Sequence, residues 1–260
     1  MEEIRVQVHK WGVKNRVTFE PSKEFILIVH SSFGIGEDFK VLGCLFDVRL
    51  SMESAIEKVL NIIRPKVKAL LRTRKIYKIE DMLHQFRTHI WGYIEYINGC
   101  INHATDTLLS KFDSVQNNFL SELGLSAELA FTKYNFAPIV SRHDIGLLGF
   151  VHKRVLGQCH EGVKELLPIR TPTIYDKHDK CIKVDMANVI YKHNIFQRSI
   201  FGTILIYNRL PPTLVKERSV QRFKSRLTEI ARKRCTKNYQ NWDKSFHSVS
   251  DLLKTLRISE

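Results

Sequence analysis

Apolar residues recur at intervals of three and four through most of the chain after residue 50, which predicts amphipathic helices. The first helix runs from Ser51, its expected N-cap, to Leu71. Pro65 is expected to bend or split it. Further helices are predicted over residues 80–98, 105–123 and 141–157. A helix-rich body therefore extends from about residue 51 to 167.

Local signals mark where these helices start and stop. Ser141, with Asp144 three residues later, is typical of a capping box and predicts the start of the fourth helix. Gly124 and Gly157 follow the third and fourth helices at positions where positive φ is needed.

The first fifty residues show a different pattern. Residues 2–14 favour a short helix, although Ile4, Val6 and Val8 also alternate as in a strand. Short strands are predicted over residues 17–19, 25–30, 39–42 and 44–47. This part of the chain is therefore expected to form a small α/β fragment.

The last third of the chain begins with a polar stretch. Residues 169–194 contain Pro172 and show no period, which predicts a long loop. A helix is predicted from Ser219, with Phe223 and Leu227 on its apolar face. The overall prediction is an α+β fold. Its expected divisions are residues 1–50, 51–100, 101–168, 169–195 and 196–260.

The composition points to a polyanionic partner. Lys and Arg number 41 against 27 Asp and Glu, a formal net charge of +14 in 260 residues. A field of this sign attracts nucleic acid, the commonest polyanion in cells. A soluble surface with a cationic bias is the alternative. The chain begins without an apolar secretory segment, and no stretch approaches the roughly 20 apolar residues of a membrane span. Five widely spaced cysteines favour free thiols, so we expect an intracellular protein of the nucleus or cytoplasm, without membrane association.

Two clusters of cations are the candidate nucleic-acid-binding residues. The first comprises Arg64, Lys66, Lys68, Arg72, Arg74, Lys75 and Lys78. On a helix, one face that points away from the apolar stripe would carry Arg64, Lys68, Arg72 and Lys75. These four side chains can therefore contact phosphates. The second cluster comprises Lys224, Arg226, Arg232, Lys233, Arg234 and Lys237. Tyr239 and Trp242 follow it, either to stack on bases or to pack in the core. For both clusters a merely solvated face is the alternative.

Other chemistry finds little support in the sequence. The cysteines and histidines between residues 159 and 193 fit no zinc motif, and no metal site is predicted. Nucleophile motifs, a P-loop and paired metal-binding acids are not evident in the sequence. His143 and Asp144 are adjacent, but we interpret Asp144 as part of a helix cap.

Three stretches follow one another along the chain. They are residues 11–24, with Asn-Arg-Val-Thr-Phe-Glu-Pro-Ser-Lys-Glu; residues 39–50, with Phe-Lys-Val-Leu-Gly-Cys-Leu-Phe-Asp; and residues 116–153, with Arg-His-Asp-Ile-Gly-Leu-Leu-Gly. In this order they resemble the C-terminal half of reverse transcriptases from non-LTR (LINE-type) retrotransposons. The segment from Phe196 to Pro212 resembles the end of such reading frames. The likeness covers nearly the whole chain.

The resemblance assigns roles to particular residues. It implies that residues 1–50 are a partial palm and that Lys23 is a candidate proton donor near the incoming nucleotide. The alternative is that Lys23 has no catalytic role and lies in a turn before a strand. Residues 51–100 would be a thumb that follows a hybrid of RNA template and DNA primer, read by shape and backbone. The hairpin that grips the primer would include Phe39, Lys40, Leu42 and Gly43.

One departure limits what the resemblance implies. The family's catalytic aspartates belong to motifs that precede the matching stretches, so polymerisation by this chain alone is not expected. Magnesium would require those acids, and no cofactor is therefore predicted for this chain. A separate palm and fingers polypeptide could supply them. The alternatives are a helical protein–protein interaction module and a non-functional relic of a mobile element.

Overall fold

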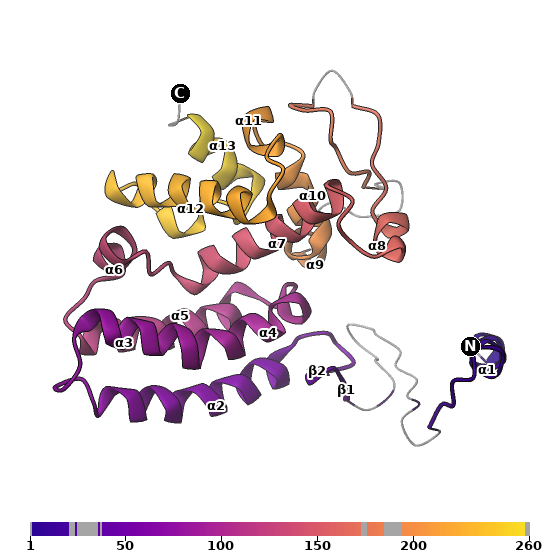
Figure 1. Cartoon of the computed structure of the whole chain (residues 1–260), viewed down its shortest axis with the longest axis horizontal. Coiled ribbons are helices and arrows are strands. Elements are labelled where there is room, and N and C mark those ends of the chain that lie inside the picture. The colour runs from indigo at the N-terminus through magenta and orange to yellow at the C-terminus, as the bar shows by residue number, and fades with distance from the viewer. Residues whose placement is uncertain are drawn as a thin grey trace. The chain divides into compact units, whose positions relative to one another are not determined.

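The computed structural model describes residues 2–20, 24, 36, 38–172, 176–184 and 194–257 (Figure 1). The chain divides into two units, Met1–Ser51 and Met52–Glu260. It is mostly helical, with one small two-stranded antiparallel sheet in its described part, which agrees with the predicted α+β class at that level. None of the described helices is both long enough and apolar enough to span a bilayer.

The first unit contains helix α1 (Glu2–Lys14) and the hairpin of β1 (Phe39–Val41) and β2 (Cys44–Phe46), as predicted. The predicted strand at residues 17–19 is wrong. These residues fold back on α1, where the amide of Val17 donates to the carbonyl of Gly12. A Cβ at Gly12 would lie 2.4 Å from the ring of Phe19, so glycine permits this contact. The predicted strand at residues 25–30 lies outside the described residues.

The second unit consists of short and medium helices in layers (Figure 1). Its described elements are α2 (Glu53–Leu71), α3 (Ile79–Phe86), π-helical η2 (Arg87–Trp91), α4 (Gly92–Ile101), α5 (Asp106–Glu122), α6 (Ala127–Tyr134), α7 (Ile139–Val155), α8 (Glu161–Leu166), α9 (Asn194–Arg198), α10 (Ile200–Tyr207), α11 (Pro212–Val215), α12 (Val220–Thr236), 3₁₀-helical η3 (Trp242–Lys244) and α13 (Val249–Arg257). Helix α2 packs against α3, α4 and α5, and α7 lies between α5 on one side and α10 and α12 on the other.

Aromatic side chains join the layers. Phe86 packs against Phe119 with ring centroids 4.6 Å apart, and Trp91 stacks on Phe136 at the same separation. The indole of Trp91 also donates to the side chain of Gln116, whose amide donates to the carbonyl of Ala137. This buried chain of contacts ties the η2 turn to α5 and to the segment that enters α7.

The start of α2 differs from the prediction. Met52, not Ser51, is the N-cap, and it has left-handed backbone geometry without a side-chain cap. The Met52 side chain is fully buried. Burial of a methionine stabilises by about 1.5–3 kcal/mol, which exceeds the roughly 1 kcal/mol that a serine cap contributes. Pro65 lies within a helix that runs unbroken to Leu71, so it does not split α2.

The predicted start of α7 is also wrong. The helix begins at Ile139, two residues before Ser141, and Asp144 does not cap it. Asp113 of α5 accepts from the backbone amides of Ile139 and Val140, at 2.8 and 3.2 Å. A carboxylate 26 residues away in sequence therefore occupies the place that a local cap would fill.

The remaining helix predictions are confirmed. Thr105 and Ser219 are side-chain N-caps of α5 and α12, and Gly124 and Gly157 have positive φ after α5 and α7. The helix predicted over 80–98 is one continuous helical run whose middle is the π-helical η2. The described part of residues 169–194 is irregular apart from one antiparallel bridge, between Ile169 and Ile182, and from the start of α9 at Asn194.

Candidate nucleic-acid interface

The hairpin that resembles a primer grip has a two-residue turn. Phe39 pairs with Phe46 and their rings stack, with centroids 5.4 Å apart. Leu42 and Gly43 form the turn with φ values of 47° and 88°. Two positive φ angles give the turn the twist that closes a hairpin, at a cost for leucine that glycine does not incur. Leu42 and Lys40 are exposed, so the tip offers an apolar side chain and a cation.

Lys23, the candidate proton donor, lies outside the described residues.

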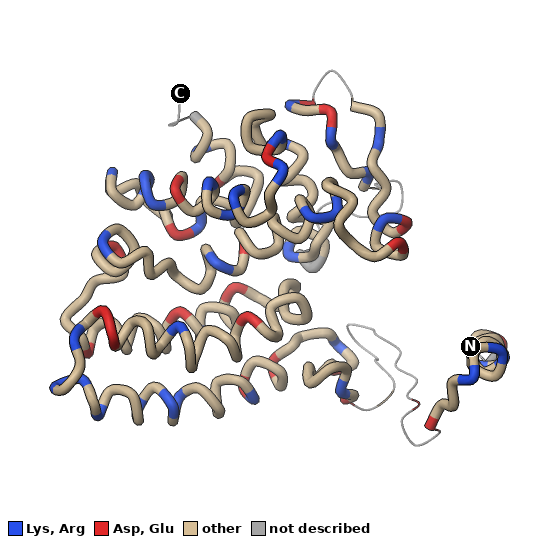
Figure 2. Tube along the Cα trace, viewed as in Figure 1, with Lys and Arg blue, Asp and Glu red and all other residues tan. Residues whose placement is uncertain are grey.

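Helix α2 has one buried face and one exposed cationic face. Ile56, Leu60 and Ile63 are fully buried against the body. Between Glu57 and Glu80 the chain contains eight cations and no acidic residue. Figure 2 shows these Lys and Arg positions recurring along α2 and the turns after it. The predicted exposure of Arg64 and Lys68 on a helix with a buried apolar stripe is therefore confirmed. The prediction that Arg72 and Lys75 continue the same helical face is wrong, because α2 ends at Leu71, Arg72 is its C-cap and Lys75 lies in the turn that follows.

The contacts of these cations leave most of the face open. All seven predicted cations of this cluster are exposed. Arg64 lies 3.5 Å from Glu57, and Arg74 lies 3.6 Å from Glu122. Exposed pairs of this kind contribute little and are screened by salt. Lys68, Arg72 and Lys75 make no ion pair with any described residue, so they are available for a polyanion.

Two tyrosines next to this face were not predicted as site residues. Tyr93 and Tyr96 lie on α4 with exposed rings, and the ammonium group of Lys66 is 5.2 Å from the ring centroid of Tyr93. Exposed aromatic rings beside cations are typical of surfaces that stack on unpaired bases. The helical period of 80–98 places Tyr96 off the apolar stripe, so its exposure was predictable. The same period predicts Tyr93 to be inside, and that prediction is wrong.

The second predicted cluster makes more contacts within the protein. A Cβ at Gly149 of α7 would lie 2.7 Å from the Lys224 side chain, so the aliphatic stem of that lysine packs on the glycine. The guanidinium of Arg226 donates to the carbonyl of Thr213 at 2.6 Å. Arg232 is half-buried, and Lys233 is exposed. Packing and hydrogen bonds thus restrict two of these four cations.

Arg234 and Trp242 belong to the core. The guanidinium of Arg234 donates to the hydroxyls of Ser245 and Thr255, at 3.2 and 2.7 Å. Trp242 stacks on Phe131 with centroids 5.5 Å apart. Trp242 therefore packs in the core and does not stack on bases. Tyr239 is half-buried, with its ring near the guanidinium of Arg234. This end of the cluster is not a surface for bases.

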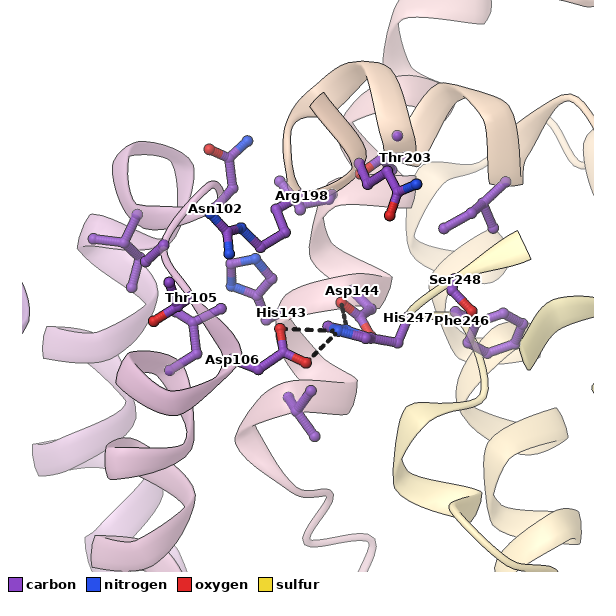
Figure 3. A pocket seen from close by; sticks show the side chains of 18 of the residues that line it. Asn102, Thr105, Asp106, His143, Asp144, Arg198, Thr203, Phe246, His247 and Ser248 are labelled. Atoms are coloured by element: carbon purple, nitrogen blue, oxygen red, sulfur yellow. Dashed lines mark hydrogen bonds and ion pairs between the residues drawn. The ribbon is translucent and has the colours of Figure 1, made fainter. Parts of the chain in front are cut away.

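Asp144 has a different partner from the one predicted. Its carboxylate lies 3.3 Å from Nδ1 of His247, and Nε2 of His247 lies 3.2 Å from Asp106 (Figure 3). The hydrogen bond to Asp144 raises the pKa of His247 to about 9, so the imidazolium is the form that joins α7 to the start of α5. No local sequence pattern predicts this link, because its three members lie more than 35 residues apart. Within the described part of the chain, no three His, Cys, Asp or Glu side chains form a group suited to a metal ion.

No protein-family model, curated protein or solved structure matches this chain. The residues and their contacts are therefore the support for a function.

Proposed function

We propose that this chain binds nucleic acid through the exposed face of α2, as the template–primer-binding portion of a reverse transcriptase of the non-LTR type. The single observation that carries the proposal is the run of exposed cations from Arg64 to Lys78, on the exposed side of α2 and in the turn that follows it. The resemblance of the motifs adds the choice of ligand, a hybrid of RNA template and DNA primer.

The length of the cationic face suits a nucleic-acid backbone. Arg72 follows Arg64 by eight positions, which at a rise of 1.5 Å per residue is about 12 Å. Phosphates follow one another at about 3.4 Å along one strand of B-DNA, so the face can contact roughly three or four of them. Such contacts position a duplex without reading its sequence, which suits an enzyme that must copy any template.

The proposal assigns the other parts accordingly. Residues 51–100 act as a thumb, and the tip at Leu42 and Gly43 contacts the primer strand. Binding alone is proposed, because the catalytic aspartates of such enzymes belong to motifs outside the resemblance. A separate palm and fingers polypeptide that carries those acids is proposed as a partner. The place of action is the nucleus or the cytoplasm.

Binding to a defined set of nucleic acids tests this proposal. Fluorescence anisotropy of the purified chain would compare a recessed RNA-template/DNA-primer hybrid with each single strand and with a blunt DNA duplex, over a series of salt concentrations. The proposal expects tightest binding to the recessed hybrid and a steep loss of affinity with salt. Equal, weak binding to every polyanion would contradict it and favour a helical protein-interaction module whose basic face meets acidic proteins.

A further inference from the structure

A cavity of about 740 Å³ lies in the second unit, apart from the cationic residues of α2. The ends of α4 and α5, helices α7 and α10, and residues 246–250 surround it (Figure 3). Phe112, Leu147 and Phe246 contribute buried apolar surface to its walls. Pockets that bind small molecules have volumes of about 300–1,000 Å³ and combine apolar walls with a few polar groups. The volume and the lining of this cavity fit that description.

His143 is an unpartnered buried group in this cavity. Its side chain is only 8% exposed, and it makes no hydrogen bond with any described residue. The other two buried histidines of the described chain are both bonded. His152 contacts Tyr207 and the carbonyl of Glu217, and His178 contacts the carbonyl of Tyr207. Burial lowers the pKa of His143, so its neutral ring offers one donor and one acceptor. The ring of His143 can therefore form hydrogen bonds with a group bound inside the cavity.

Arg198 lines the same cavity. Its side chain extends from α9 toward His143 and Asn102 (Figure 3), and its Nε is buried without a hydrogen-bond partner among the described residues. A guanidinium is always charged and has a geometry that matches carboxylates and phosphates.

The carboxylates of the cavity are already occupied by other groups. Asp106 and Asp144 contact His247, and both oxygens of Asp113 accept from backbone amides of α7. None of these three carboxylates forms an ion pair with Arg198. The cavity therefore presents a cation and a neutral imidazole without hydrogen-bond or ion-pair partners among the described residues, beside an apolar wall.

We propose that this cavity binds a small organic anion, whose phosphate or carboxylate contacts Arg198 and His143 and whose ring or chain packs against the apolar wall. The site is independent of the cationic face of α2, and it requires no unpaired base or duplex.

Equilibrium binding by calorimetry with defined probes tests the site. Adenosine 5′-monophosphate and 2-naphthoate are the phosphate and carboxylate probes, and adenosine and 2-naphthalenemethanol are their neutral counterparts. We expect at least one anion to bind with a stoichiometry of one, and at least tenfold more tightly than its neutral counterpart. Binding of one anion but not the other identifies which headgroup the site takes. Failure of both anions to bind at millimolar concentration, or equal binding of the neutral probes, overturns the proposal.

Two substitutions locate the bound anion. Arg198→Met removes the cation from a half-exposed position, and Arg209→Met is the matched control, on an exposed arginine outside the cavity lining. The site predicts a loss of affinity of tenfold or more in the first variant and none in the second. An α2 variant with Arg64, Lys68, Arg72 and Lys75 changed to Ala should bind the anion as the parent does. Loss of binding in that variant, with Arg198→Met unaffected, would place the anion on α2 and refute the site.

The ring of His143 gives a second readout that does not rely on a variant. The protein would be labelled with ¹⁵N at histidine. Nuclear magnetic resonance would then record the chemical shifts of the imidazole nitrogens as the anion is added to saturation. A new hydrogen bond should shift one of the two His143 nitrogens, while those of His152 stay in place. Unchanged His143 resonances at saturation would contradict the proposed contact.

Discussion

Helices α2 and α12 have similar lengths and similar patterns, each with an apolar stripe and a row of cations, but their cations make different contacts. On α2 and in the turn after it, Lys68, Arg72 and Lys75 are exposed and form no ion pair with described residues. On α12, Lys224 packs over Gly149 and Arg234 is buried with two hydroxyl partners. The difference comes from position, because α12 packs against α6, α7 and η3, whereas α2 lies at one side of the second unit (Figure 1). A row of cations therefore indicates a binding surface only when no other layer covers it.

The largest expected effect is on nucleic-acid affinity. Changing Arg64, Lys68, Arg72 and Lys75 together to Ala should weaken binding to the recessed hybrid by at least about 100-fold at 0.1 M salt, since each lost phosphate contact removes released counterions. A matched pair on α12, Arg232→Ala with Lys233→Ala, should weaken it much less. Anisotropy titrations measure both, and equal losses in the two variants would show that the two helices do not differ in function.

A substitution on α12 should instead affect folding. Arg234→Met leaves the hydroxyls of Ser245 and Thr255 without their charged donor, which should lower the free energy of unfolding by about 2–3 kcal/mol. Lys233→Ala, on the exposed side of the same helix, should change it by less than about 0.5 kcal/mol. Urea denaturation followed by circular dichroism measures the difference. An unchanged free energy of unfolding in Arg234→Met would contradict the stabilising role of these hydrogen bonds.

The C-terminal region should also make stability depend on pH. The folded pKa of His247 is raised from 6.5 to about 9, so its contribution is complete below pH 6.5 and is lost as pH rises through 9. His247→Gln should cost about 2 kcal/mol at pH 6.5, and that difference from the parent should disappear by pH 10. Asp113 has a folded pKa of about 6 and still titrates near pH 6.5, but it is present in both proteins, so its contribution cancels in the difference between the variant and the parent. A constant difference across the range would contradict the charged link to Asp144 and Asp106.

The smallest expected effect concerns the packed lysine of α12. Gly149→Ala would place a Cβ 2.7 Å from the side chain of Lys224, which is flexible and can move. The helix propensity of alanine offsets the lost packing, so the free energy of unfolding should change by less than about 1 kcal/mol. If Lys224 then becomes free to bind phosphate, hybrid affinity should rise slightly, by about twofold. Thermal denaturation and anisotropy would detect a larger change of either kind.

Sequence reasoning succeeded where the cause is local. The helical period placed α2, α5 and α12, and local caps at Thr105 and Ser219 were recognisable from residue type. It failed where the cause is distant in sequence. The amides at the start of α7 are capped by Asp113 of α5, so Ser141 and Asp144 looked like a cap without serving as one. Met52 displaced Ser51 at the start of α2 because of burial that no local pattern shows.

The candidate sites divide in the same way. The cationic face of α2 follows from the helical period alone, because exposure there needs only a buried opposite face. The burial of Arg234 depends on Ser245 and Thr255, which reach it through the fold. His143 and Arg198 are 55 residues apart, and the sequence gives no sign that they line one cavity. Tyr96 was recognisable from the period as lying off the apolar stripe, whereas the period places Tyr93 on the stripe and its exposure was not predicted.

The salt dependence of hybrid binding tests the central claim most directly. The slope of log affinity against log salt concentration would be measured for the parent chain and for the α2 variant with four cations replaced. Each phosphate contact contributes about 0.7–0.9 to the slope. If α2 contacts the phosphate backbone, loss of four contacts should make the slope shallower by about three. An unchanged slope, with both proteins binding the recessed hybrid, would contradict the claim that the open face of α2 holds the nucleic acid.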